Sequence, residues 1–342
     1  MQNITKIGIL GAGTWGIALA RMLSRAGHSV TVWSAIEKEA DNLSATARHP
    51  NFPDVELPKQ IVYTKDIKEA CSDMDIVIFA VPSPFIRVTA RKAAPHIANG
   101  QIIVNVAKGI EVETLYTMTE IISEELGNPT VKLVALSGPT HAEEVIKDLP
   151  TAITSASSDA EAAKAVQRVF TVGCMRVYTN DDIRGVELCG ALKNVIALAS
   201  GIATGLGCGD NAKAALITRG IAEISRLGIA MGCREQTFGG LAGIGDLIVT
   251  ATSMHSRNNR CGMLIGQGVA VDKAIEEIGM VVEGINALPA AISLAQKYAV
   301  EMPIVETVDA ICSGRIEASK AIQMLMSREL KCELSSSAFD HI

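Results

Sequence analysis

The chain has 342 residues, of which 48% are hydrophobic and 20% charged, with a formal net charge of −6. This composition excludes a disordered chain, supplies a core for about two domains, and argues against nucleic acid as a partner. The eight cysteines form no C-x-x-C pair, so we expect reduced thiols and no metal site. Because no charge-free apolar run reaches about 18 residues, we also expect no membrane insertion.

The first half of the chain alternates short apolar runs with stretches of helical spacing. The expected strands are Lys6–Leu10, Ser29–Trp33, Met74–Val81, Gln101–Ala107 and Val131–Pro139. Continuous apolar strands separated by helices indicate a parallel sheet that is covered on both faces. The sequence therefore predicts an α/β fold with an N-terminal Rossmann-like, doubly wound sheet.

After Arg184 the pattern changes to long stretches of helical period with little strand signal. The expected helices are Val186–Ala203, Ala212–Met231, Val271–Ile278, Leu288–Tyr298, Val305–Cys312 and Ala318–Met326. We therefore expect two domains: residues 1–184 form the dinucleotide-binding domain, and residues 185–342 form an all-helical domain that binds substrate and carries the catalytic groups.

The turn "GAGTWG" follows the first strand and opens a helix, which is the context in which G-x-G-x-x-G binds a dinucleotide. Gly11 allows the tight turn, Gly13 lets the pyrophosphate approach the backbone, and Gly16 lets helix and strand pack closely. An acid at the end of the second strand would select NAD, and an arginine there would select NADP. The chain has Ser34 and Ala35 at those positions, so the preference between NAD and NADP stays open.

The segment "GVELCGALKNVIALASGI" is one apolar helix with Lys193 near its middle. Burying a lysine is costly unless it is paired, so Lys193 is a candidate catalytic group. The alternative is a lysine whose stem packs in the core while its amine reaches solvent.

Four further stretches carry candidate groups, each with a structural alternative. Lys108 follows a strand at the edge where α/β sheets bind ligands, or it is a solvated lysine. Gly138 and Thr140 lie at the next such edge, where Thr140-x-x-Glu143 also fits a plain helix cap. Asp246 follows a glycine-rich turn and also fits an N-cap. Ser256, Arg257 and Asn258 are donors suited to phosphate, or they belong to a polar loop.

Together these segments resemble the bacterial NAD(P)-dependent glycerol-3-phosphate dehydrogenases. The matching segments include "GILGAGTWGIALA", "NVAKGIE", "LSGPTHAEEV", the lysine helix and "FGGLAGIGDLIVTATSMHSRN", in the same order from about residue 5 to 330. The resemblance implies reversible hydride transfer between NAD(P)H and dihydroxyacetone phosphate, giving sn-glycerol 3-phosphate for glycerophospholipid synthesis. It also implies a cytoplasmic homodimer.

The resemblance also implies roles for individual residues. Lys193 is the catalytic acid and base, with Asp246 beside it. The implied substrate-binding residues are Lys108, Gly138, Thr140, Lys193, Asp246, Ser256, Arg257 and Asn258. The implied cofactor-binding residues are Thr14, Trp15, Lys108, Ala142, Arg257, Val281 and Glu283. They add to Gly11, Gly13, Gly16 and Ser34, which the turn and the strand end already indicate as cofactor-binding. The family usually has a basic residue where this chain has Ser34 and Ala35, which leaves the 2′-phosphate contact open.

Two other classes of function fit parts of the sequence. Another two-domain dehydrogenase, acting on a hydroxy acid or an opine, would need an anion site for a carboxylate. A nucleotide-sensing module without catalysis would keep "GAGTWG" but would not need Lys193, Asp246 and the Ser-Arg-Asn triplet together.

Overall fold

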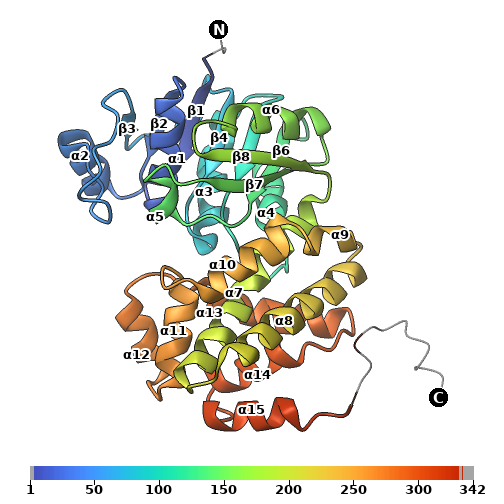
Figure 1. Cartoon of the computed structure of the whole chain (residues 1–342). Coiled ribbons are helices and arrows are strands. Elements are labelled where there is room, and N and C mark those ends of the chain that lie inside the picture. The colour runs from blue at the N-terminus through green and yellow to red at the C-terminus, as the bar shows by residue number, and fades with distance from the viewer. Residues whose placement is uncertain (1–3, 331–332, 334–342) are drawn as a thin grey trace.

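The structure is a computed structural model that describes residues 4–330 and 333. Strands with covering helices form the N-terminal part, and helices alone form the C-terminal part (Figure 1). The last strand ends at Asn180, and the long helix that opens the second part begins at Ile183.

Within the described residues, eight strands form one sheet in the order β3-β2-β1-β4-β5-β6-β7-β8. Every neighbouring pair is parallel except β6 and β7, so the sheet is mostly rather than wholly parallel. The strands are β1 (Lys6–Leu10), β2 (Ser29–Trp33), β3 (Val62–Thr64), β4 (Ile76–Phe79), β5 (Ile102–Asn105), β6 (Lys132–Ser137), β7 (Thr151–Ala156) and β8 (Met175–Asn180).

Helices cover the sheet on both faces, as the doubly wound pattern predicts. On one face α1 (Thr14–Arg25), α5 (Ala142–Val145) and α6 (Ala160–Phe170) bury apolar side chains against the strands. On the other face α3 (Ile86–Ala93) and α4 (Met118–Leu126) do the same. The remaining helical segments of this part are α2 (Glu37–Thr46), η1 (Ser83–Phe85) and η2 (Ala94–His96).

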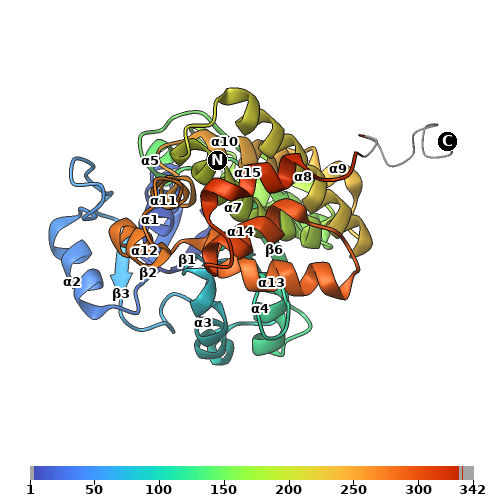
Figure 2. The same cartoon turned by 90° about the horizontal axis from the view of Figure 1, so that it is seen from below.

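The second part is built around α7 (Ile183–Gly205), which the other helices surround (Figure 2). Among the described helices, only α7 has the length and hydropathy of a membrane span, yet its apolar window is entirely buried, as in a core helix. The surrounding segments are α8 (Asp210–Ala230), α9 (Glu235–Phe238), η3 (Leu241–Gly245), α10 (Asp246–Thr252), α11 (Arg257–Gly266), α12 (Val271–Ile278), α13 (Glu283–Lys297), α14 (Pro303–Cys312) and α15 (Ala318–Met326).

Several elements were not expected from the sequence. Strand β3 has only three residues, β7 is interrupted by the polar residues Thr151, Thr154 and Ser155, and β8 carries exposed polar residues, so none of them gives a continuous apolar signal. Helices α9, α10 and α11 are short and interrupted by glycine-rich and polar turns. The interpretation of Ser256, Arg257 and Asn258 as a polar loop is wrong, because Ser256 caps α11 and Arg257 is the first residue of that helix.

Helices α7 and α11 cross with their backbones in close contact. A Cβ atom on Gly262 of α11 would lie 2.2 Å from the carbonyl oxygen of Leu198 on α7. Since α7 carries Lys193 and α11 begins at Arg257, this close crossing sets the distance between the two candidate residues.

We predict that Gly262→Ala lowers the free energy of unfolding by about 2 kcal/mol, because the added methyl group forces the two backbones apart. Gly239→Ala is the matched control: Gly239 is in the right-handed helical region and the nearest atom to its Cβ would be 3.8 Å away. Urea unfolding followed by circular dichroism measures both. Equal stability of the two variants would contradict the close crossing.

Candidate active site

The glycine turn has the geometry that a dinucleotide requires. Gly11 has a φ of +126°, and a Cβ there would lie 2.7 Å from the carbonyl oxygen of Ala80. A Cβ on Gly16 would lie 2.2 Å from the carbonyl oxygen of Gly11, so Gly16 permits the close packing of α1 on β1. Gly13 is the exposed N-cap of α1 and has open space around it. The turn therefore presents a free helix N-terminus beside Thr14 and Trp15, which fits a pyrophosphate.

Ser34 lies directly after β2, at the same edge of the sheet as the glycine turn. The register pairs Leu10 with Trp33, and the backbone N–H of Gly11 donates to the carbonyl of Trp33 at 2.9 Å. Ser34 is therefore next to the turn, where a Rossmann sheet holds the adenosine ribose.

Lys193 is buried in the middle of α7, with an exposed fraction of 4%. Its Nζ lies 2.8 Å from Oδ1 of Asp246 and donates to the hydroxyl of Thr250. Burial lowers the pKa of Lys193 to about 8, because desolvation and the charge of Lys108 outweigh the attraction of Asp246. The alternative in which the amine reaches solvent is wrong.

Asp246 is the first residue of α10 and is 1% exposed. Its interpretation as an N-cap is wrong, since Gly245 occupies that position and no side chain caps the helix. The carboxylate instead joins two ammonium groups: Oδ1 faces Lys193, and Oδ2 accepts from Lys108 at 2.6 Å. A buried carboxylate between two cations is compensated from both sides.

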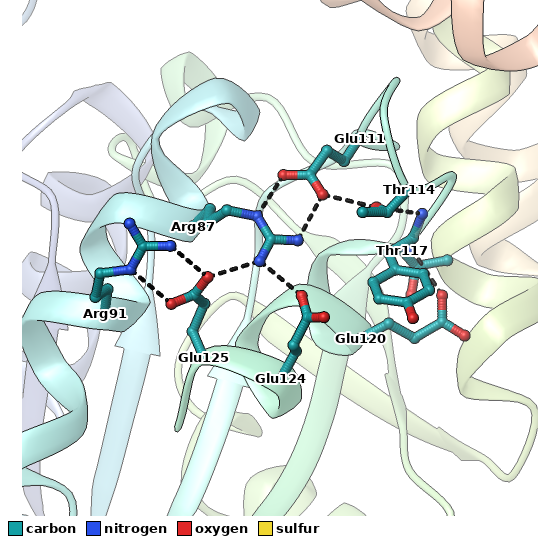
Figure 3. Close-up of polar contacts among 9 residues, drawn as sticks. Arg87, Arg91, Glu111, Thr114, Thr117, Glu120, Glu124 and Glu125 are labelled. Carbon is teal, nitrogen blue, oxygen red and sulfur yellow. Dashed lines mark hydrogen bonds and ion pairs between the residues drawn. The ribbon is translucent and has the colours of Figure 1, made fainter. Parts of the chain in front are cut away.

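Lys108 reaches this carboxylate from the loop that follows β5, and its Nζ also donates to the carbonyl of Gly138 at 3.2 Å. The interpretation as a solvated lysine is therefore wrong. The same loop is fixed further along by Arg87 of α3, whose Nε and Nη2 donate to the two carboxylate oxygens of Glu111 at 2.7 and 2.6 Å. Figure 3 shows Arg87 between Glu111 on one side and Glu124 and Glu125 on the other.

A second buried carboxylate, Glu187 of α7, holds the beginning of this loop. It accepts from the side-chain amide of Asn105 at 2.8 Å, and from the backbone N–H of Thr119 at 3.0 Å. Asn105 also bonds the backbone N–H and carbonyl of Ala107, the residue before Lys108. Burial raises the pKa of Glu187, while these hydrogen bonds oppose the rise. The helix that carries Lys193 thus also positions the backbone of Lys108.

Thr140 does not cap a helix, so that interpretation is wrong. Helix α5 begins at Ala142 with His141 as its N-cap, and the hydroxyl of Thr140 donates back to the carbonyl of Gly138 at 3.1 Å. In the part of the chain that the structure describes, the buried Nε2 of His141 has no hydrogen-bond partner. Burial lowers the pKa of His141, and the nearby charge of Lys193 lowers it further.

The N-terminus of α11 brings Ser256, Arg257 and Asn258 together. Ser256 caps the helix by accepting from the N–H of Asn259 at 3.2 Å, which leaves the N–H groups of Arg257 and Asn258 without an acceptor inside the helix. Arg257 donates to the carbonyl of Val281 at 2.9 Å. The amide of Asn258 donates to Asn194 at 2.9 Å and accepts from the N–H of Gly284 at 2.8 Å, so it ties α11 to α7 and α13.

Glu283 connects the two parts of the chain. Its carboxylate accepts from the N–H and the hydroxyl of Ser83 at 3.2 and 2.6 Å, and Ser83 follows β4 at the carboxyl edge of the sheet. Burial raises the pKa of Glu283, and the charge of Arg257 acts against the rise. Arg257, Val281 and Glu283 therefore form one group.

Sequence reasoning missed Thr250, Glu187 and Ser83. Thr250 had a signal, because residues four apart on a helix share a face and Asp246 was already a candidate. The hydroxyl of Thr250 donates a hydrogen bond to the backbone carbonyl of Asp246 at 2.6 Å. Its oxygen is therefore oriented to accept a hydrogen bond from Nζ of Lys193. The contacts of Glu187 and Ser83 join residues 68 and 200 positions apart, and local pattern carries no trace of them.

Comparison with known proteins agrees over the length of the chain. Residues 6–163 match the N-terminal model, and residues 182–323 the C-terminal model, of NAD-dependent glycerol-3-phosphate dehydrogenase. The chain is 61% identical to glycerol-3-phosphate dehydrogenase [NAD(P)+] 2 of Lactobacillus delbrueckii, over 97% of this chain and 100% of that protein. It is 50% identical to the corresponding protein of Fusobacterium nucleatum, with the same coverage.

A solved structure is also similar. The crystal structure of glycerol-3-phosphate dehydrogenase from Coxiella burnetii matches with a TM-score of 0.90 and 37% identity. The match covers 95% of this chain and 99% of that one.

We predict that Asp246→Asn lowers the free energy of unfolding by about 3 kcal/mol at about pH 7, where the variant leaves buried ammonium groups uncompensated. The loss should shrink at about pH 9.5, because Lys193 is neutral above its pKa of about 8 and no longer needs the carboxylate. Urea unfolding at both pH values measures it.

Asp210→Asn is the control for this measurement. Asp210 is fully exposed, and its pair with Lys213 at 3.7 Å is a surface ion pair, which contributes little to stability. This substitution should change stability by less than about 0.5 kcal/mol at either pH. An Asp246→Asn loss that is the same at both pH values would contradict a titrating Lys193 beside Asp246.

Proposed function

The chain belongs to the NAD(P)-dependent glycerol-3-phosphate dehydrogenase family, and we propose that it interconverts sn-glycerol 3-phosphate and dihydroxyacetone phosphate with Lys193 as the acid and base. The observation that carries this proposal is the buried contact of 2.8 Å between Lys193 and Asp246. It is supported by a pKa of about 8 for Lys193, at which both protonation states are accessible near neutral pH.

The reaction moves a hydride and a proton. Bound NAD(P)H supplies the hydride to the carbonyl carbon of dihydroxyacetone phosphate. The ammonium of Lys193 stabilises the charge that develops on the carbonyl oxygen and donates the proton that completes the hydroxyl group. In the oxidative direction, neutral Lys193 removes that proton. The negative charge of Asp246 raises the pKa of Lys193 against the effect of burial, and the hydroxyl of Thr250 orients Nζ of Lys193.

The substrate phosphate is assigned to the N-terminus of α11. The free N–H groups of Arg257 and Asn258, the cap Ser256 and the guanidinium of Arg257 are donors suited to a phosphate dianion. Gly138 and Thr140 border the substrate on the side of the sheet, and Lys108 lies between them and Asp246. Holding the unreactive phosphate fixes the carbonyl group relative to Lys193.

The dinucleotide is assigned to the carboxyl edge of the sheet. Gly11, Gly13, Thr14, Trp15 and Gly16 would hold the pyrophosphate, and Ser34 would lie beside the adenosine ribose. Ala142, Arg257, Val281 and Glu283 would border the nicotinamide end together with Lys108. The Ser83–Glu283 contact supports this, because it brings the C-terminal part against the sheet edge.

We keep residues 1–184 as the dinucleotide-binding domain and residues 185–342 as the catalytic and substrate-binding domain. The short turn between Asn180 of β8 and Ile183 of α7 lies just before this position and supports a boundary close to it. For assembly and location, we propose a homodimer in the cytoplasm on the strength of the family. A dehydrogenase of another substrate class is disfavoured, because similarity to glycerol-3-phosphate dehydrogenases extends over both parts of the chain.

We predict that Lys193→Ala lowers kcat by about 10³-fold in dihydroxyacetone phosphate reduction, since the proton donor is lost. The variant should fold and bind the reduced cofactor, because Lys108 still pairs with Asp246 at 2.6 Å. Steady-state kinetics and cofactor fluorescence measure the two effects.

Lys320→Ala is the control, because Lys320 is exposed and pairs with Glu317 one helical turn away. It should keep full turnover. Near-normal turnover of Lys193→Ala would overturn the assignment of Lys193.

A further inference from the structure

The hydroxyl of Ser34 is committed to two hydrogen bonds that fix a carboxylate. It accepts from the backbone N–H of Ile36 at 3.1 Å and donates to Oε2 of Glu39 at 2.5 Å. Glu39 belongs to the first turn of α2, and its side chain reaches back to the end of β2. A carboxylate is therefore held at the end of this strand although no acid stands there in the sequence.

This carboxylate lies close to the glycine turn. Ser34 follows Trp33, whose carbonyl accepts from the N–H of Gly11. The buried His49 also lies near Glu39. Burial lowers the pKa of His49, and the charge of Glu39 and a backbone hydrogen bond at Ala12 both oppose that lowering. Glu39 is thus near residues that themselves contact the turn.

Positive charge near this carboxylate is scarce. Residues 34–41 contain three acids (Glu37, Glu39 and Asp41) and one base, the exposed Lys38. The nearby Lys65 pairs with Asp41 at 2.8 Å. The guanidinium of Arg48 donates to the carbonyl of Pro53 at 2.6 Å.

We propose that this chain selects NADH over NADPH, with the Glu39 carboxylate, held by Ser34, accepting a hydrogen bond from the 2′-hydroxyl of the adenosine ribose. A carboxylate at the end of the second strand performs this role in NAD-specific Rossmann folds. A 2′-phosphate would meet the carboxylate as a like charge and would find Ala35 where a cation is needed. The proposal rests on the assignment of the dinucleotide to this edge under the proposed function.

The test measures binding of NADH and NADPH to the full chain without substrate, by fluorescence titration or calorimetry. For the unmodified chain we expect the Kd for NADH to be at least about tenfold lower than that for NADPH. Glu39→Gln should lower the ratio of the Kd for NADPH to the Kd for NADH several-fold, because the amide does not repel a phosphate.

Glu37→Gln is the matched control. It removes the same charge two positions away, where the side chain is exposed and its carboxylate lies 4.0 Å from Lys65, whereas Ser34 donates to Glu39. Its ratio should stay within about twofold of the unmodified chain. Ala35→Arg, at an exposed position, should lower the Kd for NADPH, since it supplies the missing cation.

Equal or tighter binding of NADPH by the unmodified chain would overturn the proposal. So would an unchanged ratio in Glu39→Gln, or an Ala35→Arg variant that gains no affinity for NADPH. These readouts need no turnover. A chain that binds NADH selectively but does not reduce dihydroxyacetone phosphate would therefore overturn the proposed function and leave the selectivity of Glu39 standing.

Discussion

One buried carboxylate organises the site: Asp246 compensates two ammonium groups, Lys193 from α7 and Lys108 from the loop after β5. Without it, neither lysine has an acid within contact distance among the described ion pairs. Its negative charge is what lets a lysine be buried and still protonated, because desolvation alone drives the pKa of a buried lysine far down. The pKa of about 8 for Lys193 is the balance of burial, attraction by Asp246 and repulsion by Lys108.

Asp246 and its two partners come from three separate elements: Asp246 from α10, Lys193 from α7 and Lys108 from the loop after β5. The core helix α7 carries Lys193, and through Glu187 and Asn105 it also holds the backbone that carries Lys108. Helix α10 presents Asp246 and Thr250 on one face, and α11 crosses α7 at backbone contact and presents Arg257. The contacts between the sheet edge and the helical part hold these charges together, since a shift between the two parts would separate Lys108 from Asp246.

Local pattern was enough to predict most of the sheet and the positions of the glycine turn, Lys108 and the buried Lys193. The glycine turn, the buried lysine and the strand after which Lys108 lies all carry signals within about ten residues. The pairing of Lys193 with Asp246 spans 53 positions (193 to 246) and depends on packing of the helical part. The contact of Ser34 with Glu39 is different: the two residues are five positions apart, but the contact depends on how the first turn of α2 lies against the end of β2. Strand β7 was not predicted because small and polar residues break its apolar pattern, and β8 was not predicted because exposed polar residues alternate with its apolar ones.

The most direct test of the account is the pH dependence of the hydride-transfer step in both directions, measured by stopped flow with saturating substrates. If Lys193 is the acid and base, reduction slows and oxidation accelerates as the pH rises through one pKa near 8. The Asp246→Asn variant should titrate at lower pH, because the attraction that raises the pKa is gone. Rates that do not change between about pH 6 and about pH 10, or that titrate only near the ordinary lysine pKa of about 10.4, would contradict it.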